Sequence, residues 1–263
     1  MINKPVIGVA ALIFVLAAAG VYYLRSRSQP LPAAPSAPAA VAPSASEPGI
    51  AHPLPEGAGN AAATPLPQLA DSDAPLRDAL SQISSADAVK DFLVPQDLIR
   101  KIVVTIDNLP RQKVAVDKRP ANPAAGSFLA NGDELHGTLD QHNFERYKPM
   151  VAVVSQLDAK QLGALYVHYY PLFQESYQNL GYPNGYFNDR LVEVIDNLLA
   201  TPEPKGPIEL VRPNVMYTYA DPALESRTAG QKLLIRMGPE NAKAIKAKLT
   251  ELRAVITAGQ LKH

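Results

Sequence analysis

The first apolar segment of the chain is long and uninterrupted. Residues 5–24 read PVIGVAALIFVLAAAGVYYL and contain no charged side chain. A helix of this length, at a rise of about 1.5 Å per residue, spans a hydrocarbon core about 30 Å thick. Tyr22 and Tyr23 stand at one end, where such rings favour the membrane interface. We therefore expect a transmembrane anchor over residues 1–28 that contacts the lipid bilayer through residues 5–24.

A cleaved signal peptide is the alternative interpretation of the same segment. Lys4 would form its charged region, and residues 17–19 (AAA) would form an A-x-A cleavage site. The apolar run continues beyond that site to Leu24, which an anchor requires and a signal peptide does not. The charges on the two sides, Lys4 against Arg25 and Arg27, do not fix the orientation. A short tail before an apolar helix is typical of an uncleaved export signal, so we expect the rest of the chain outside the cytoplasm.

Residues 29–67 show no apolar periodicity. Ten Pro and twelve Ala fall between positions 30 and 67, and no Lys or Arg occurs between positions 29 and 68. Such a composition buries too little apolar area to offset the entropy of ordering the chain. Proline favours the extended polyproline II conformation, at about 3.1 Å per residue. We expect a disordered Pro/Ala-rich linker.

Beyond residue 67 the apolar residues recur with a helical period. The clearest stripes lie in residues 95–108, 143–157, 158–181, 187–200, 232–237 and 239–258. Asp158 with Gln161, and Thr228 with Gln231, have the spacing of helix N-caps. Short extended segments are expected at 208–211 and 215–219, with a small hairpin at Asn131-Gly132. The fold class is mostly α, with a single soluble domain over residues 68–263 of about six helices and little strand.

Charge and composition narrow the function classes. After residue 67 the chain carries 22 Lys and Arg against 23 Asp and Glu, whereas a general nucleic-acid binder needs a basic surface. With no Cys in the chain, disulfides, thiolate metal sites and a Cys nucleophile are excluded. The five His residues have no metal-binding spacing, and no phosphate or dinucleotide motif occurs. We predict no cofactor, no metal site and no catalytic residue, and whether the chain is an enzyme stays open, with non-enzymatic function preferred.

Three groups of residues are candidates for binding. Tyr182 and Tyr186 lie in a loop off the helical stripe, within a segment where eight of residues 166–187 are Tyr or Phe. Asp189, Glu193 and Asp196 share one helix face, next to Arg190. The third group is Arg146 with Tyr147, and Arg236 in an apolar helix. Each group also has a structural interpretation, respectively as an aromatic core, a solvated face and buried ion pairs.

Several stretches resemble one known family. They are residues 65–76, 103–110 (VVTIDNLP), 146–147, 170–202 (YPLFQESYQNLGYPNGYFNDRLVEVIDNLLATP), 219–225 (YADPALE) and 229–241 (AGQKLLIRMGPEN). The chain is similar to a bacterial membrane-anchored family with a domain of unknown function, number three thousand and fourteen. The resemblance implies an N-terminal anchor, a Pro/Ala linker and one domain in Gram-negative bacteria. It implies no activity, cofactor or site residues.

Together these features predict a single-pass protein of the bacterial inner membrane whose domain faces the periplasm. The preferred function is non-enzymatic binding or scaffolding in the cell envelope, with an envelope protein or peptidoglycan as partner and no nucleic acid. Two alternatives stay open. One is an envelope enzyme acting on glycan through carboxylates among Glu175, Asp189, Glu193 and Asp196. The other is a small-ligand sensor that uses the tyrosine-rich region.

Overall fold

The structure is a computed structural model that describes residues 49–55, 65–112, 118–214 and 216–258 of the chain. The expected anchor at residues 5–24 and most of the expected linker lie outside these residues. Within the described ranges, none of the helices combines the length and the apolar character needed to cross a bilayer.

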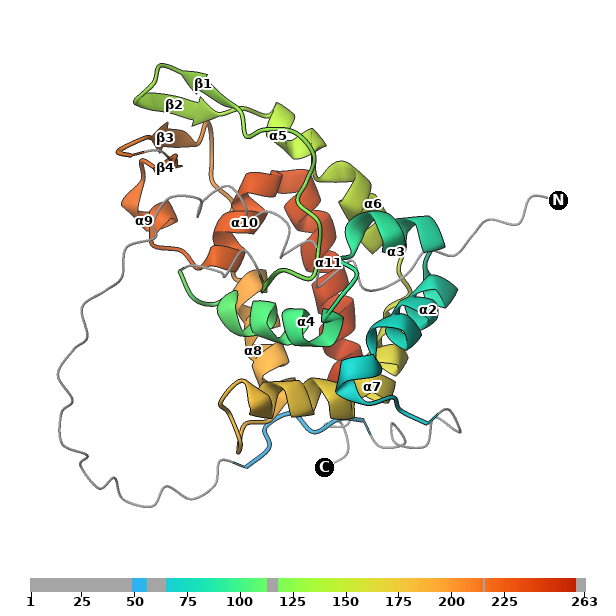
Figure 1. The fold of residues 1–263 in the computed structure, drawn as a ribbon. Helices are drawn as coiled ribbons and strands as arrows, with labels where there is room; N and C mark the ends of the chain where they lie inside the picture. Colours follow the sequence, from blue (N-terminus) through green and yellow to red (C-terminus); the bar gives the residue numbers. More distant parts are fainter. Residues whose placement is uncertain (1–48, 56–64, 113–117, 215, 259–263) are drawn as a thin grey trace.

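The described part of the chain is mostly helical, as predicted (Figure 1). The estimate of about six helices was too low, because the structure has ten α-helices and a 3-10 turn in these residues. The short helices α3 (Ala86–Phe92), α5 (His142–Glu145) and α9 (Pro222–Glu225) produce no periodic pattern, and the longer α2 (Asp73–Ile83) was also not predicted. The helical elements are η3 (Leu69–Asp71), α2 (Asp73–Ile83), α3 (Ala86–Phe92), α4 (Leu98–Asn108), α5 (His142–Glu145), α6 (Lys148–Ser155), α7 (Ala159–Asn179), α8 (Phe187–Leu199), α9 (Pro222–Glu225), α10 (Ala229–Met237) and α11 (Pro239–Ile256).

Side-chain caps start the helices where the sequence predicts them. The Asp158 carboxylate accepts hydrogen bonds from the backbone N–H groups of Lys160 and Gln161 at the start of α7. The Thr228 hydroxyl accepts one from the N–H of Gln231 in α10. These bonds satisfy donors that have no partner within the helix.

Two helix predictions differ from the structure. The stretch 95–108 becomes helical only at Leu98, where the carboxylate of Asp73 in α2 accepts from the N–H groups of Asp97 and Leu98 at 2.7 and 2.8 Å. The stretch 143–157 is split into α5 and α6, which are separated at Arg146 and Tyr147. At Leu98 a contact from another part of the chain accompanies a boundary that local periodicity does not reveal.

Helix α11 lies at the centre of the helical body and packs against α6, α7, α8 and α10 (Figure 1). Its predicted apolar stripe is buried, with Ile245, Leu249, Leu252 and Ile256 in the core. The aromatic residues of α7 complete this core. The rings of Phe173 and Phe187 are stacked with centroids 5.8 Å apart. Most of the aromatic segment is therefore core, which agrees with its structural interpretation.

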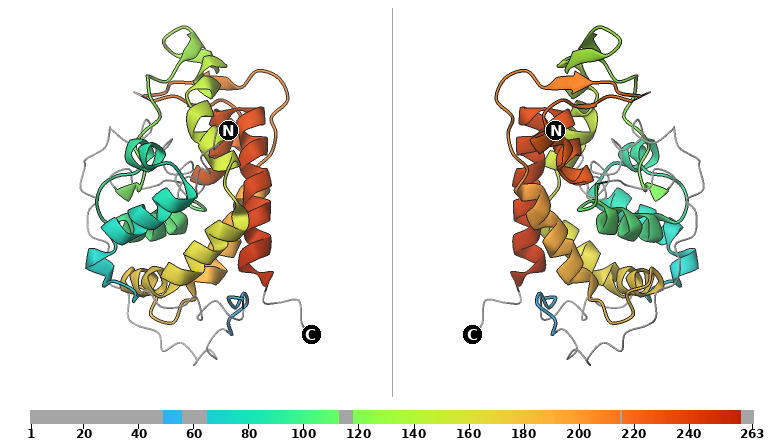
Figure 2. Two further views of the ribbon diagram at one scale, coloured as in Figure 1. Left: turned by 90° about the vertical axis from the view of Figure 1, so that its right-hand side faces the viewer. Right: turned by 90° about the vertical axis from the view of Figure 1, so that its left-hand side faces the viewer.

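A small antiparallel sheet covers one end of the helical body (Figures 1 and 2). Its strands are β1 (Ala130–Gly132), β2 (His136–Leu139), β3 (Glu209–Val211) and β4 (Thr218–Tyr219), in the order β1-β2-β3-β4. The predicted hairpin exists as β1–β2. However, Gly132 pairs with Gly137 inside the ladder, so Asn131-Gly132 ends a strand rather than forming the turn.

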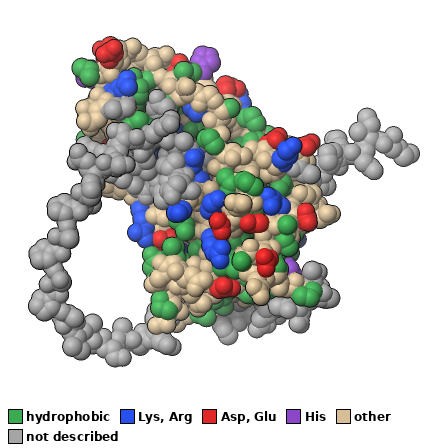
Figure 3. Space-filling model, in the orientation of Figure 1, with side chains coloured by type: hydrophobic (Ala, Val, Ile, Leu, Met, Phe, Trp, Pro, Cys, Tyr) green, Lys and Arg blue, Asp and Glu red, His purple; other side chains and the backbone are tan. Residues whose placement is uncertain are grey.

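Residues 49–55 differ from the expectation of a linker without fixed structure. They lie against the helical body near α7 and the N-terminal end of α8 (Figure 2). The face of the molecule seen in Figure 3 has basic and acidic side chains interspersed.

Candidate functional site

A buried carboxylate ends α4. Asp107 lies in the last turn of this helix, and its side chain is only 5% exposed. The C-terminal end of a helix carries partial negative charge, and its last carbonyl groups lack partners within the helix. A buried carboxylate in this position is unfavourable unless cations and donors lie beside it. Asp107 therefore depends on partners from other parts of the fold.

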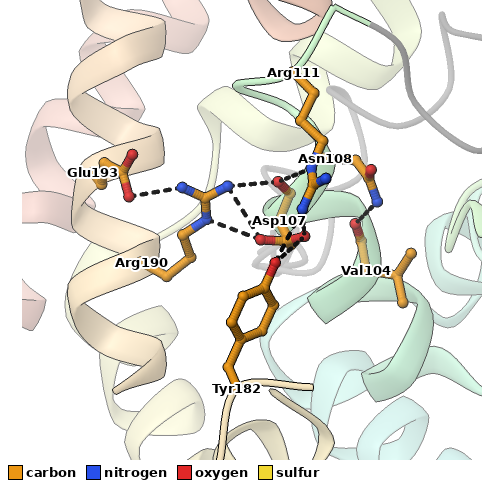
Figure 4. Close-up of polar contacts among 7 residues, drawn as sticks. All are labelled: Val104, Asp107, Asn108, Arg111, Tyr182, Arg190 and Glu193. Carbon is orange, nitrogen blue, oxygen red and sulfur yellow. Dashed lines mark hydrogen bonds and ion pairs between the residues drawn. The ribbon is translucent and has the colours of Figure 1, made fainter. Parts of the chain in front are cut away.

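Arg190 in α8 is the inner partner of Asp107 (Figure 4). Its Nε donates to Asp107 Oδ1 at 3.1 Å, and its Nη2 donates to the backbone carbonyl of Asp107 at 2.7 Å. Its Nη1 donates to Glu193 at 2.7 Å. Burial lowers the pKa of the Arg190 guanidinium, but Glu193 and Asp107 outweigh burial and raise that pKa overall. Arg190 thus stays charged and joins α8 to the end of α4.

Arg111 and Tyr182 contact Asp107 from the other side (Figure 4). Arg111 Nη2 donates to Asp107 Oδ2 at 2.7 Å and to the Tyr182 hydroxyl at 3.0 Å. The Tyr182 hydroxyl in turn donates to Asp107 Oδ2 at 3.4 Å. The hydrogen bond to Asp107 and its charge raise the pKa of Arg111. The Arg111 side chain is 52% exposed, against 18% for Arg190, so Arg111 is the outer partner.

One glutamine fixes the loop of residues 181–186 that carries the two candidate tyrosines. Gln174 in α7 donates from Nε2 to the carbonyl of Gly185 at 2.7 Å. Its Oε1 accepts from the N–H of Phe187 at 2.8 Å. That N–H is one of the donors at the start of α8 that have no partner within the helix. A single side chain therefore sets both the loop and the first residue of α8.

These groups surround a hollow of about 310 Å³. Three tyrosine side chains, three carboxylates and one guanidinium line it, and the Tyr177 and Tyr182 rings stack with centroids 4.6 Å apart. Ring faces beside hydrogen-bond acceptors suit a sugar ring or a peptide. We call this hollow the tyrosine pocket, and its lining is Asp107, Tyr177, Tyr182, Tyr186, Asp189, Arg190 and Glu193.

The wall at Asp189 also contacts residues 49–55. The Asp189 carboxylate accepts from the N–H groups of Ala51 and His52, at 3.1 and 2.6 Å. The amide of the neighbouring Asn188 donates to the His52 carbonyl at 2.8 Å. The Tyr186 hydroxyl accepts from the N–H of Leu54 at 3.4 Å. Two pocket residues, Tyr186 and Asp189, therefore also hold the segment that precedes the domain.

The carboxylates on the exposed face of α8 each have a different partner. Asp189 contacts residues 51 and 52, whereas Glu193 pairs with Arg190. Asp196 accepts from Nε and Nη2 of Arg253 in α11 at 2.6 and 2.9 Å. Glu175 is exposed on α7. Asp189 and Glu193 both line the tyrosine pocket, but each already accepts hydrogen bonds, from residues 51 and 52 and from Arg190 respectively. Neither is an uncommitted acid or base of the kind that hydrolysis of a glycan uses.

The other three predicted residues lie outside the tyrosine pocket. Arg146 donates to the backbone carbonyls of Ala125 and Gly126 at 2.8 and 3.0 Å, so it fixes a loop. Tyr147 is buried, and burial raises its pKa. The Arg236 guanidinium lies over the ring of Tyr219, 5.5 Å from its centroid. Nearby, Glu225 pairs with Lys232 at 3.0 Å.

A larger cavity, of about 850 Å³, lies between the sheet and the helical body. The sequence did not predict it, because its walls come from segments far apart in the chain. Its lining includes Leu139, Phe144, Ile208, Leu234 and Ala242, with Lys246 among its polar members. Lys246 Nζ donates to the carbonyl of Thr201 at 2.6 Å. The cavity contains none of the predicted site residues.

Within the described ranges, no three His, Asp or Glu side chains gather as a metal site would require. His136 and His142, the two histidines nearest in sequence, lie beside Asp133 and Asp140 respectively. Each of these carboxylates has its pKa lowered mainly by hydrogen bonds from backbone N–H groups.

Sequence reasoning missed Asp107 and Arg111, although a signal was present. The tetrapeptide Ile-Asp-Asn-Leu occurs at residues 106–109 and again at 195–198. In both copies the Asp follows an apolar helical stripe, close to a helix C-terminus where a carboxylate is disfavoured. In the structure both are paired with an Arg from another helix, Arg190 for Asp107 and Arg253 for Asp196.

Comparison with known proteins assigns the chain to a family. A family model described as "Protein of unknown function (DUF3014)" matches residues 98–253, which include α4, the loop of residues 181–186 and α8. No curated protein and no solved structure matches the chain. The match covers more than half of the 263 residues and confirms the resemblance noted in residues 103–241. The chain is therefore a member of the DUF3014 family.

Proposed function

We propose that the protein is a non-enzymatic binding or scaffolding protein of the bacterial cell envelope. Residues 5–24 hold it in the inner membrane as a single-pass anchor, and the helical domain faces the periplasm. The domain binds an envelope protein or peptidoglycan through the tyrosine pocket. The uncharged segment 5–24 and the Pro/Ala-rich stretch that follows support the tethered arrangement.

The observation that carries this proposal is that ion pairs and hydrogen bonds fix the walls of the tyrosine pocket. Arg190 and Arg111 pair with Asp107 on its two sides, and Gln174 fixes the loop that bears Tyr182 and Tyr186. The half-buried rings of these two tyrosines are therefore held in place before any ligand arrives. Rigid aromatic side chains bind at low entropic cost, which is why they recur at binding hot spots.

The same contacts favour binding over catalysis. A general acid and a general base must both reach one reacting bond. The carboxylates of α8 are instead directed to residues 51 and 52, to Arg190 and to Arg253. The glycan-enzyme alternative therefore has less support than the binding function.

Site-specific photocrosslinking in intact cells tests the proposal. A benzoylphenylalanine in place of Tyr182 is expected to give a crosslinked product with an envelope protein or with peptidoglycan. The same group in place of Leu135, an exposed residue of the β1–β2 connection, is the matched control. Identical product patterns at both positions, or no product at Tyr182, would count against the tyrosine pocket as the binding site.

Reporter fusions after Lys262 test the proposed location. A reporter active only in the periplasm is expected to be active, and one active only in the cytoplasm is expected to be silent. The opposite result would overturn the proposed orientation. Size comparison of the mature chain separates a retained anchor from a cleaved signal peptide.

The larger cavity favours a second candidate function, the sensing of a small apolar ligand. A hollow of about 850 Å³ lined by both apolar and polar residues is of the size that encloses small molecules. The dye 8-anilinonaphthalene-1-sulfonate is a suitable probe. Its fluorescence is expected to rise with the wild-type protein and not with Ala242→Phe, which fills the cavity. Equal fluorescence from a folded Ala242→Phe protein would remove this candidate.

A further inference from the structure

Residues 49–55 are held at Tyr186, Asn188 and Asp189 by hydrogen bonds of their own backbone. The N–H groups of Ala51 and His52 donate to Asp189, and the carbonyl of His52 accepts from Asn188. The N–H of Leu54 donates to the Tyr186 hydroxyl. The Leu54 side chain adds an apolar contact with the core. This is how proteins commonly hold an extended peptide, with main-chain hydrogen bonds giving the affinity.

The receiving side chains are positioned by the domain itself. Asn188 is fully buried, and its Oδ1 accepts from the Tyr166 hydroxyl at 3.1 Å. Its Nδ2 also lies 3.3 Å from the carbonyl of Ile256, to which it donates. Asp189 stands in the first turn of α8, whose start is set by Gln174. Asn188 and Asp189 are therefore ready to receive a peptide without rearrangement.

We propose that Tyr186, Asn188 and Asp189 form a slot for an extended peptide backbone, and that residues 49–55 of the same chain occupy it as a releasable strap. We call residues 49–55 the tether strap. Its few hydrogen bonds contribute free energy of the same order as the entropy lost in ordering seven residues. Docking is therefore favoured by a small margin, so most molecules hold the strap and a modest change in conditions releases it.

Release of the tether strap alters the tyrosine pocket. Tyr186 and Asp189 line the pocket and also hold the strap. While the strap is docked, both Asp189 oxygens accept from its backbone. A pocket ligand that needs Asp189 therefore competes with the strap, so the two affinities are reciprocally linked. This regulatory role rests on the proposed function of the pocket, whereas docking of the strap does not.

A distance measurement on the full-length chain in detergent tests docking. Because the chain has no Cys, Ile50→Cys and Leu135→Cys give two spin labels on exposed sites. Leu135 belongs to the connection between β1 and β2, at the end of the domain remote from the strap (Figure 2). We expect one narrow distance distribution by double electron–electron resonance. A broad distribution in this parent protein would overturn the proposal.

A matched pair of substitutions identifies the contact that holds the strap. His52→Pro removes the N–H that donates to Asp189, and His52→Ala keeps it. We expect His52→Pro to shift the docking equilibrium at least about tenfold towards release, and His52→Ala to keep the narrow distribution. Asp189→Asn is expected to weaken docking as well. A narrow distribution that persists in His52→Pro would contradict the slot. Loss of the narrow distribution on dilution with unlabelled protein would show that the strap comes from a second copy.

Hydrogen exchange tests the link to the pocket. Residues 182–190 are expected to exchange several-fold faster in His52→Pro than in His52→Ala. Equal exchange in the two variants would remove the regulatory role while leaving docking established. A failure of the Tyr182 crosslink would instead remove the function of the pocket and leave the distance result unchanged. The two proposals can therefore fail separately.

Discussion

The carboxylate of Asp107 and the guanidinium of Arg190 form a largely buried ion pair between the C-terminal end of α4 and the first turn of α8. Arg190 also donates to the backbone carbonyl of Asp107 and so satisfies an acceptor at the end of α4. Arg190 therefore caps the C-terminal end of α4 and also joins α4 to α8. It also fixes the distance across the tyrosine pocket.

Substitution of Asp107 should destabilise the domain strongly. Asp107→Asn leaves the Arg190 guanidinium without its buried counter-charge, and breaking such a pair from one side costs about 3–5 kcal/mol. We expect a loss in the free energy of unfolding of about 2–4 kcal/mol, because Glu193 still pairs with Arg190. Urea denaturation followed by circular dichroism measures it.

Asp196→Asn is the matched control for Asp107→Asn. Asp196 holds the same place in the second Ile-Asp-Asn-Leu tetrapeptide, but its pair with Arg253 is exposed, at 49% and 36% of the two side chains. Exposed pairs contribute about 0–1 kcal/mol. Equal losses from the two substitutions would contradict the structural role given to Asp107.

Gly238 should not tolerate a side chain. It joins α10 to α11 with a φ of 85°, and an added Cβ would lie 2.5 Å from Cγ of Phe144. We expect Gly238→Ala to cost about 2–5 kcal/mol, as the sum of a left-handed backbone and a steric clash. Thermal unfolding measures this cost. Gly181→Ala shares the positive φ, but its added Cβ meets no atom within 4 Å, so we expect it to cost less. An equal loss of stability in the two variants would show that the clash with Phe144 contributes nothing.

The alkaline limit of stability should depend on Tyr219. Burial raises the pKa of its hydroxyl to about 12, although Arg236 acts in the opposite direction. An unfolded Tyr ionises near pH ~10. Between these values the unfolded chain has lost a proton that the folded chain keeps. The free energy of unfolding therefore falls as pH rises from about 10 to about 12, by up to about 1.4 kcal/mol per pH unit from this group.

Tyr219→Phe isolates that contribution. At pH 8 the variant is expected to be less stable by about 1 kcal/mol, because it lacks the hydrogen bond from the hydroxyl to the Lys232 carbonyl. The deficit should shrink or reverse by pH 11, because Tyr219 of the wild-type protein then ionises in the unfolded chain but not in the folded one. This difference lowers the free energy of unfolding of the wild-type protein and not that of the variant. Unfolding curves at the two pH values measure it, and a deficit independent of pH would be incompatible with the raised pKa.

Two tyrosine hydroxyls should differ in their importance for folding. Tyr166→Phe removes the buried donor to Asn188 Oδ1, so it is expected to cost about 1–3 kcal/mol. Tyr182→Phe removes contacts with Arg111 and Asp107 at a half-buried site, and less than about 1 kcal/mol is expected. Denaturant titration of both variants checks the order. A larger loss of stability from Tyr182→Phe than from Tyr166→Phe would contradict this order.

Local pattern was sufficient for much of the fold. Helix α8 was predicted as residues 187–200 and observed as Phe187–Leu199, because its stripe and its stop are both local. The caps Asp158 and Thr228 were also predicted correctly. The hairpin and the two later extended segments were predicted, but their assembly into one sheet was not, because β2 pairs with β3 from a segment about 70 residues further along the chain. Periodicity in a short strand carries no information about its partner.

The candidate site was predicted in part for the same reason. Tyr182, Tyr186, Asp189, Arg190 and Glu193 are neighbours in sequence, and the structure brings all five to one pocket. Asp107 comes from α4, and no local signal pairs it with Arg190. Arg146 and Arg236 were selected because a charge in an apolar segment needs partners. The structure gives them those partners, in a backbone loop for Arg146 and in the ring of Tyr219 for Arg236.

The docked position of residues 49–55 has a consequence for the proposed membrane anchor. With an anchor at residues 5–24, the free span from bilayer to domain is then residues 25–48, roughly 75 Å when fully extended, instead of roughly 130 Å for residues 25–67. The span also leaves the domain beside α7 and the start of α8. Tension on this span would therefore be transmitted to Tyr186 and Asp189, which line the tyrosine pocket.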